Sequence, residues 1–202
     1  MEAHDRVIQK SMELFTQYGI RQVTMDQIAE ELGMSKRTIY ELFKDKDTLV
    51  AECIETMFTL YNEEIRNIIA GASNVIEALY LLGQHGQKKR ASVNRLYFED
   101  LRKYYPGLHE SIMKRTRPGK GSFSCSIITK GIEEGIFQAD LNIEIVDSFL
   151  YMMMESFHKK GIYPENTTEK EVLRNIIIPY YLGISTEKGK KIIEQYIPLT
   201  LN

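Results

Sequence analysis

Residues 23–49 read VTMDQIAEELGMSKRTIYELFKDKDTL, and their capping residues predict two short helices joined by a tight turn. Thr24 and Gln27 form a capping-box pattern, in which side chains satisfy free N–H groups at the start of a helix. Gly33 is suited to the left-handed conformation that ends a helix, and Ser35 is suited to cap the next one. The stretch is therefore predicted to fold as a helix-turn-helix.

The apolar residues of the two predicted helices lie at spacings that let them face one another across the turn. Ala29 permits a close crossing, because a larger side chain there would push the helices apart. The residues expected to pack across the turn are Ile28, Leu32, Ile39, Leu42 and Phe43.

Polar side chains at the N-terminal end of the second helix take no part in this packing and are expected to be exposed. They are hydrogen-bond donors suited to phosphates and base edges, and a recognition helix directs this end into the major groove. For an arbitrary charged helix a solvated face would be the better interpretation, but the surrounding motif favours DNA contact. These donors are Lys36, Arg37, Thr38 and Tyr40, with Lys44 and Lys46 extending the basic edge.

The rest of the chain shows helical spacing of apolar residues and no sustained strand alternation, which predicts an all-α fold. We expect an N-terminal three-helix helix-turn-helix domain over residues 1–46 and a larger helical bundle over 47–202. A break or kink is expected at Pro118-Gly119 and a kink at Pro179. Helices are predicted at 3–18, 47–70, 74–85, 88–104, 107–134, 142–160, 168–182 and 186–196.

Composition excludes several classes of protein. A net charge of −2 argues against non-specific coating of nucleic acid, which needs many phosphate-neutralising Lys and Arg. The first residues carry charges where a signal peptide would be apolar, and no segment reaches about 18 apolar residues, so neither export nor membrane insertion is expected. Cys53 and Cys125 have no zinc-site spacing and are interpreted as core residues, in keeping with a reduced cytoplasm.

The histidines offer no recognisable catalytic or metal site. None of the four lies in an HExxH motif, and the chain has no GxSxG, P-loop or GxGxxG pattern. Glu155 and His158 form half of a di-iron bundle motif, but the second copy is missing. We therefore expect no enzyme activity, no metal and no cofactor.

Residues 3–49 resemble the DNA-binding domain of the TetR (tetracycline repressor)/AcrR family of transcription regulators. The resemblance implies that Thr24, Tyr40 and Lys46 contact phosphates; Lys36, Arg37 and Thr38 are its candidates for reading bases, and Ser35 and Lys44 complete the expected DNA-binding set. The resemblance is carried by Phe15, Tyr18-Gly19, Val23-Thr24, Ile28-Ala29, Leu32-Gly33-Met34-Ser35, Thr38-Ile39-Tyr40 and Phe43-Lys44-Asp45-Lys46.

The resemblance also implies a body that encloses a ligand pocket and pairs its last two long helices with those of a second subunit. Residues 142–160 are apolar on nearly all sides, which requires burial on more than one face. A core helix would explain this, as would a dimer seam, and the seam is favoured because an operator reader benefits from two-fold symmetry. The expected interface residues are Phe149, Met153, Phe157 and Ile176.

A small, largely apolar effector is expected in the pocket of the body, since its helices are rich in Tyr, Phe and Met. Ordinary core packing is the alternative for each lining residue. The candidates are Tyr61, Phe98, Leu101, Tyr104, Ile127, Met152 and Glu155.

The sequence thus predicts a homodimeric, sequence-specific regulator of transcription that binds double-stranded, near-palindromic operator DNA, with repression as the family default. The alternative is a helical dimer whose head binds protein. Exposed apolar residues on the 36–43 helix would have favoured that alternative, whereas Lys36, Arg37 and Thr38 do not.

Overall fold

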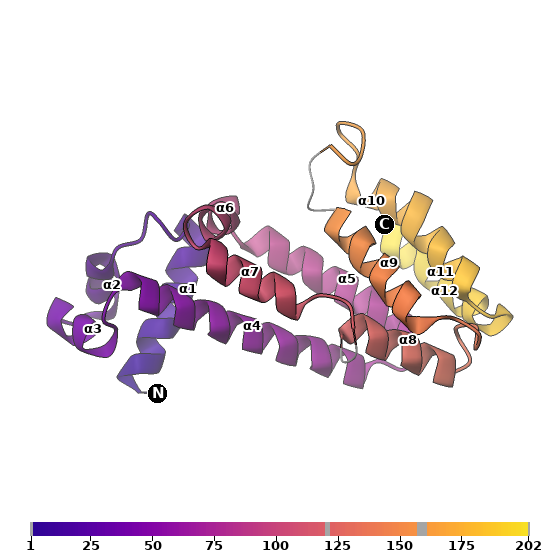
Figure 1. Cartoon of the computed structure of the whole chain (residues 1–202), viewed down its shortest axis with the longest axis horizontal. Coiled ribbons are helices and arrows are strands. Elements are labelled where there is room, and N and C mark those ends of the chain that lie inside the picture. Colours follow the sequence, from indigo (N-terminus) through magenta and orange to yellow (C-terminus); the bar gives the residue numbers. More distant parts are fainter. Residues whose placement is uncertain (1, 120–121, 157–160, 202) are drawn as a thin grey trace. The chain divides into compact units, whose positions relative to one another are not determined.

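The computed structural model describes residues 2–119, 122–156 and 161–201, and within them every helix or strand element is a helix, so the all-α class is confirmed. An isolated β-bridge joins Phe137 and Ser185. The helices are Ala3–Tyr18 (α1), Met25–Leu32 (α2), Lys36–Leu42 (α3), Lys46–Gly71 (α4), Val75–Ser92 (α5), Arg95–Tyr104 (α6), Pro106–Arg115 (α7), Phe123–Glu133 (α8), Ile143–Ser156 (α9), Glu169–Val172 (α10), the π-helical turn Leu173–Ile177 (η1), Ile178–Ile184 (α11) and Glu187–Leu201 (α12) (Figure 1).

The chain forms two compact units. Unit 1 comprises Met1–Asn67 and Gln84–Arg115, and unit 2 comprises Ile68–Gly83 and Thr116–Asn202, so that α4 and α5 each contribute to both. This grouping does not test the predicted division into 1–46 and 47–202, which stays a prediction.

Unit 1 is built on one hydrophobic core that joins the helix-turn-helix to α1, α4 and α6. Cys53 lies in this core, as expected, and burial raises the pKa of its thiol to about 12. The fully buried side chains include Val7, Phe15, Ile20, Val23, Ile28, Ile39, Phe43, Leu49 and Val50.

Unit 2 packs α8 against α9 and α11 against α12 (Figure 1). Phe137 and Ile136, which follow the left-handed Gly135, are buried in its core. The buried carboxylate of Asp147 on α9 accepts hydrogen bonds from the Ser122 hydroxyl and the Gly119 N–H, which holds the segment before α8.

Two predicted helix boundaries need correction. The predicted break between the helices 74–85 and 88–104 is absent, because α5 continues through Gly86 to Ser92. The break falls instead at Asn94, whose side chain accepts the N–H of Leu96 and so starts α6.

The two predicted interruptions are present. The 107–134 segment is broken between Arg115 and Phe123, where Ser122 caps α8. Pro179 stands at the start of α11, directly after the π-helical turn. Proline has no N–H to give and its ring clashes with the carbonyl one turn earlier, so a regular α-helix cannot run through this point.

Candidate DNA-binding site

The helix-turn-helix forms as the capping residues predicted. The Thr24 hydroxyl accepts the N–H of Gln27 at 3.1 Å, and the Ser35 hydroxyl accepts the N–H of Thr38 at 3.1 Å, so α2 and α3 begin where expected. Gly33 ends α2 with a φ of 63°, a conformation that glycine adopts without steric cost.

The predicted contacts across the turn hold α2 and α3 together. Ile28, Ile39 and Phe43 are fully buried, and Ala29 is buried between the helices. Leu32 and Leu42, the other members of the predicted set, are half-buried and pack against the same core. One face of α3 is therefore fixed by packing.

The opposite face of α3 carries the donors. Lys36, Arg37 and Tyr40 are exposed, and Thr38 is half-buried. An ion pair with Asp26 raises the pKa of Lys36, and Arg37 pairs with Glu41 at 2.7 Å. Exposed pairs of this kind contribute little to stability, so both cations can exchange their carboxylates for phosphates or base edges.

The remaining predicted DNA-binding residues differ in their exposure. Thr24, Ser35 and Lys44 are exposed. Lys46 is half-buried at the start of α4, its ammonium donates to the Arg21 carbonyl at 3.3 Å, and burial lowers its pKa. A phosphate contact by Lys46 stays a prediction.

The residues predicted for an effector pocket fall into both units. Leu101 and Ile127 are buried in the cores of units 1 and 2, respectively. The side chain of Glu155 lies outside the described residues. The exposed members are Tyr61, Phe98 and Tyr104 of unit 1 and Met152 of unit 2.

Tyr104 lines a cleft of about 300 Å³ within unit 1, together with Arg21, Lys46 and Tyr105. The side chains of Arg21 and Lys46 bring two positive charges to this cleft, which a largely apolar effector would leave without partners. The predicted pocket residues stay predictions.

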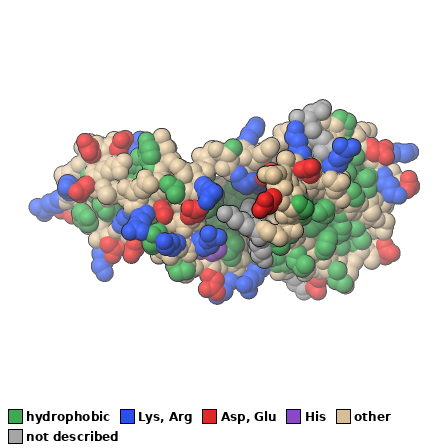
Figure 2. All heavy atoms as spheres, turned by 90° about the horizontal axis from the view of Figure 1, so that it is seen from above, with side chains coloured by type: hydrophobic (Ala, Val, Ile, Leu, Met, Phe, Trp, Pro, Cys, Tyr) green, Lys and Arg blue, Asp and Glu red, His purple; other side chains and the backbone are tan. Residues whose placement is uncertain are grey.

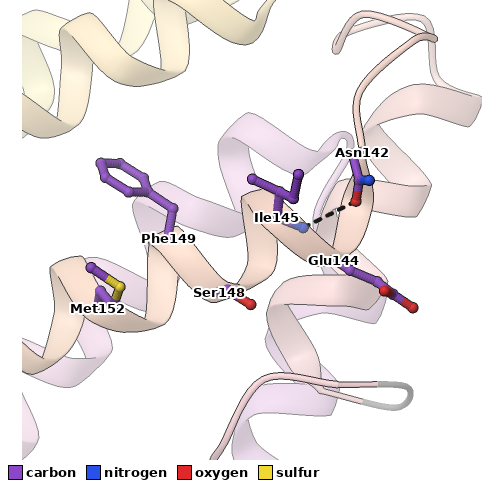
Figure 3. A pocket seen from close by; sticks show the side chains of 6 residues that line it. All are labelled: Asn142, Glu144, Ile145, Ser148, Phe149 and Met152. Carbon is purple, nitrogen blue, oxygen red and sulfur yellow. Dashed lines mark hydrogen bonds between the residues drawn. The ribbon is translucent and has the colours of Figure 1, made fainter.

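The predicted interface helix α9 has two apolar faces. Met153 is only 7% exposed and packs with Val146 and Leu150 in the unit's own core. Phe149 is 39% exposed on the other face and lines an open groove of about 430 Å³ (Figure 3). Ile176, on η1, is 36% exposed, and Phe157 lies outside the described residues.

The predictions missed Ile145, which lines the same groove and is 66% exposed. The signal was present in the three- and four-residue steps from Asn142, directly before α9, to Ile145, Phe149 and Met152 along α9 (Figure 3). On the face drawn in Figure 2, hydrophobic side chains gather over unit 2, and charged side chains of both signs cover unit 1.

The comparison with known proteins agrees with this geometry. Residues 7–53, which contain α2 and α3, match the family model described as "Bacterial regulatory proteins, tetR family". The chain carries, in residues 7–53, a DNA-binding domain of this family. It is therefore a DNA-binding transcriptional regulator, as the sequence predicted.

Individual relatives are distant. The HTH-type transcriptional repressor KstR2 of Mycobacterium tuberculosis is 21% identical over 140 residues, which cover 68% of this chain and 70% of that protein. The regulator HbdR of Aromatoleum sp. is 31% identical over 78 residues, 39% of this chain and 34% of that protein. A transcriptional regulator from Cytophaga hutchinsonii has the same fold, with a TM-score of 0.62 at 19% identity over 96% of both chains.

Within the part of the chain that the structure describes, no helix combines the length and the apolar character needed to cross a bilayer.

Proposed function

We propose that this regulator is a homodimeric repressor that binds a near-palindromic operator and is released from it by a small, largely apolar effector. The observation that carries the DNA-binding part is the exposed end of α3, where Lys36, Arg37 and Tyr40 face solvent while Ile39 anchors the helix. Repression is supported by the relatives named as KstR2 repressors. A protein that reads chromosomal DNA acts in the bacterial cytoplasm, and we propose no enzyme activity for it.

The alternative, a head that binds protein, is less well supported. A protein-docking surface would place apolar side chains at the centre of the contact, whereas the exposed end of α3 presents a cation pair, a hydroxyl and a phenol. In-vitro selection of bound DNA from a random pool tests the choice, because an enriched two-fold symmetric site reports specificity and dimeric binding together. Failure to enrich any sequence would reject the proposal.

Replacing Arg37 by alanine is expected to weaken operator binding by about 1–3 kcal/mol, because it removes a base or phosphate contact. The thermal midpoint should barely change, since the side chain is 87% exposed. Tyr40→Phe should weaken binding in the same direction by removing a phosphate contact. Fluorescence anisotropy with the selected site, at matched salt, measures both.

Arg95→Ala provides a matched control for Arg37→Ala. Arg95 also pairs with a glutamate four residues ahead, at 2.6 Å, and is 78% exposed, but it lies on α6. It should bind DNA as the parent does. If Arg37→Ala and Tyr40→Phe also bind with parental affinity, α3 is not the reading helix.

The effector and the operator are expected to weaken each other's binding by the same factor, because the coupling between two ligand sites is reciprocal. Allosteric coupling typically lies in the range of about 5- to 150-fold. Calorimetric titration of an effector found by thermal-shift screening, with and without saturating operator, measures how far the operator weakens effector binding. Fluorescence anisotropy, with and without saturating effector, measures how far the effector weakens operator binding. An effector affinity unchanged by saturating DNA would reject release by this ligand.

A further inference from the structure

Asn94 caps the ends of two helices in unit 1. Its backbone N–H donates to the Thr16 carbonyl at 2.8 Å and its side-chain amide donates to the Gln17 carbonyl at 2.9 Å, both in the last turn of α1. Its side-chain oxygen accepts the N–H of Leu96 at 2.9 Å, which starts α6. The last carbonyls and the first N–H groups of a helix have no hydrogen-bond partner within it. Asn94 therefore joins α1 to α6 by binding carbonyls at the end of α1 and an N–H at the start of α6.

Helix α6 also holds the turn that follows α1. The carboxylate of Asp100, in the second turn of α6, accepts the Arg21 N–H at 2.8 Å. The Arg21 guanidinium lies over the ring of Tyr104, 4.7 Å from its centroid, and donates to its hydroxyl. Lys46 holds the Arg21 carbonyl from the start of α4. Both polar groups of the Arg21 backbone, and its side chain, are therefore bound.

Gly19 lets α6 approach this turn closely. A Cβ at Gly19 would lie 3.0 Å from the Cβ of Leu96 and 3.1 Å from a carboxylate oxygen of Asp100, and its φ is +90°. Ile20 and Val23, in the same turn, are fully buried. The turn thus has little freedom to move relative to α6.

This turn leads directly to Thr24, the cap of α2, and α2 packs against α3. The position of α6 therefore sets where α2 and α3 lie within unit 1. We propose that Asn94, Asp100 and Tyr104 are positioning residues for DNA binding, which hold the α1–α2 turn so that the exposed end of α3 is presented in its binding orientation. The inference rests on the proposed function of α3.

Loosening this contact should lower DNA affinity without removing any contact to DNA. When only a fraction of the molecules holds the binding-competent arrangement, the apparent association constant equals the intrinsic one multiplied by that fraction. We expect about a threefold loss for Asn94→Ser, which keeps a good N-cap for α6 but loses the amide that binds Gln17. With Tyr104→Phe added, we expect about a tenfold loss.

The salt dependence separates positioning from contact. Both substitutions leave the net charge unchanged and remove no phosphate contact, so the slope of log K against log salt should stay at the parental value, whereas Lys36→Ala should reduce it by about 1. Asp100→Ala is a second, independent variant. Loss of a negative charge alone favours DNA binding, so weaker binding by this variant reports lost positioning.

Thr168→Ala is the matched control for a lost cap, since Thr168 caps α10 in unit 2. It should lose comparable stability and keep parental operator affinity. If Asn94→Ser unfolds below the assay temperature, Asp100→Ala and Tyr104→Phe decide the question. Parental affinity in these variants, or a reduced salt slope in the neutral ones, would overturn the positioning role. A parent that binds no DNA would instead overturn the proposed function.

Discussion

Gly189→Ala is expected to destabilise unit 2 by at least about 2–3 kcal/mol. Gly189 is buried in the first turn of α12, and a Cβ there would overlap the carbonyl oxygen of Ile136 and stand 3.0 Å from the Cβ of Ser185. Overpacking costs about 1–3 kcal/mol even where side chains can shift, and here the obstructing atom is backbone. The thermal midpoint should fall by roughly 10 °C or more.

The backbone at Ile136 has little room to yield. Its carbonyl accepts the Thr186 N–H at 2.9 Å, and the Thr186 hydroxyl donates to the Gly135 carbonyl at 2.7 Å. On the other side, the Gln138 N–H donates to the Ile184 carbonyl at 3.0 Å. Moving Ile136 away from α12 would break this set of hydrogen bonds.

Urea denaturation followed by circular dichroism measures the change, with Gly183→Ala as the control. Gly183 lies in α11 and is exposed, and a Cβ added there would meet no neighbouring side chain or helix within 4 Å. Alanine should be neutral there or stabilise the helix by about 0.5–1 kcal/mol. Equal midpoints for Gly189→Ala and the parent would show that α12 does not pack on Ile136 as described.

The helix-turn-helix was predictable because its determinants are local. Thr24, Gly33 and Ser35 act within four residues of their partners, and the apolar spacing across the turn involves only residues of this segment. The same holds for the donors of α3, which are exposed because the neighbouring positions are buried.

The contact between α6 and the end of α1 was not predictable in this way. Asn94 and Gln17 are 77 residues apart, and an asparagine between two helices has no pattern that names a distant carbonyl as its partner. The end of α5 was misplaced for a related reason, since Gly86 is a weaker signal than the cap that Asn94 forms with α6. Close approaches such as Gly189 to Ile136 likewise depend on tertiary packing.

The orientation of α9 lay between these cases. Its sequence predicted an element apolar on nearly all sides, but packing against α8 decided which stripe faced inward. Met153 joined the core with Val146, while Ile145 and Phe149 stayed exposed. The proposed dimer seam therefore lies on the exposed face of α9, and Met153 lies on the face that packs in the core.

Ile145→Glu is expected to convert the proposed dimer into a monomer. Ile145 is 66% exposed and Met152 is 64% exposed on the same stripe of α9. Phe149, which lies between them, packs on Tyr180 of α11 with the ring centroids 4.8 Å apart, so the stripe continues onto that helix. A two-fold contact between such stripes would bury the new carboxylate without a partner, which is strongly unfavourable.

Ile145 is the better position for this test, because a glutamate there should not harm the isolated subunit. The residue lies in the first turn of α9, where its N–H is already bound by the Asn142 side chain at 3.1 Å (Figure 3). A negative charge at a helix N-terminus is favourable. Phe149→Glu would instead disturb the contact with Tyr180 within the subunit.

Loss of the dimer should lower operator affinity by about 100-fold or more, because two linked heads gain roughly 10²- to 10⁴-fold over one. Light scattering should give a mass near the 23.5 kDa of one chain for Ile145→Glu and twice that for the parent and for the apolar control Ile145→Leu. Binding of the variant to a half-site should match the parent's, since α3 is untouched. A parent that is monomeric at micromolar concentration would rule out the dimer. A folded Ile145→Glu protein that remains dimeric would place the seam on another surface.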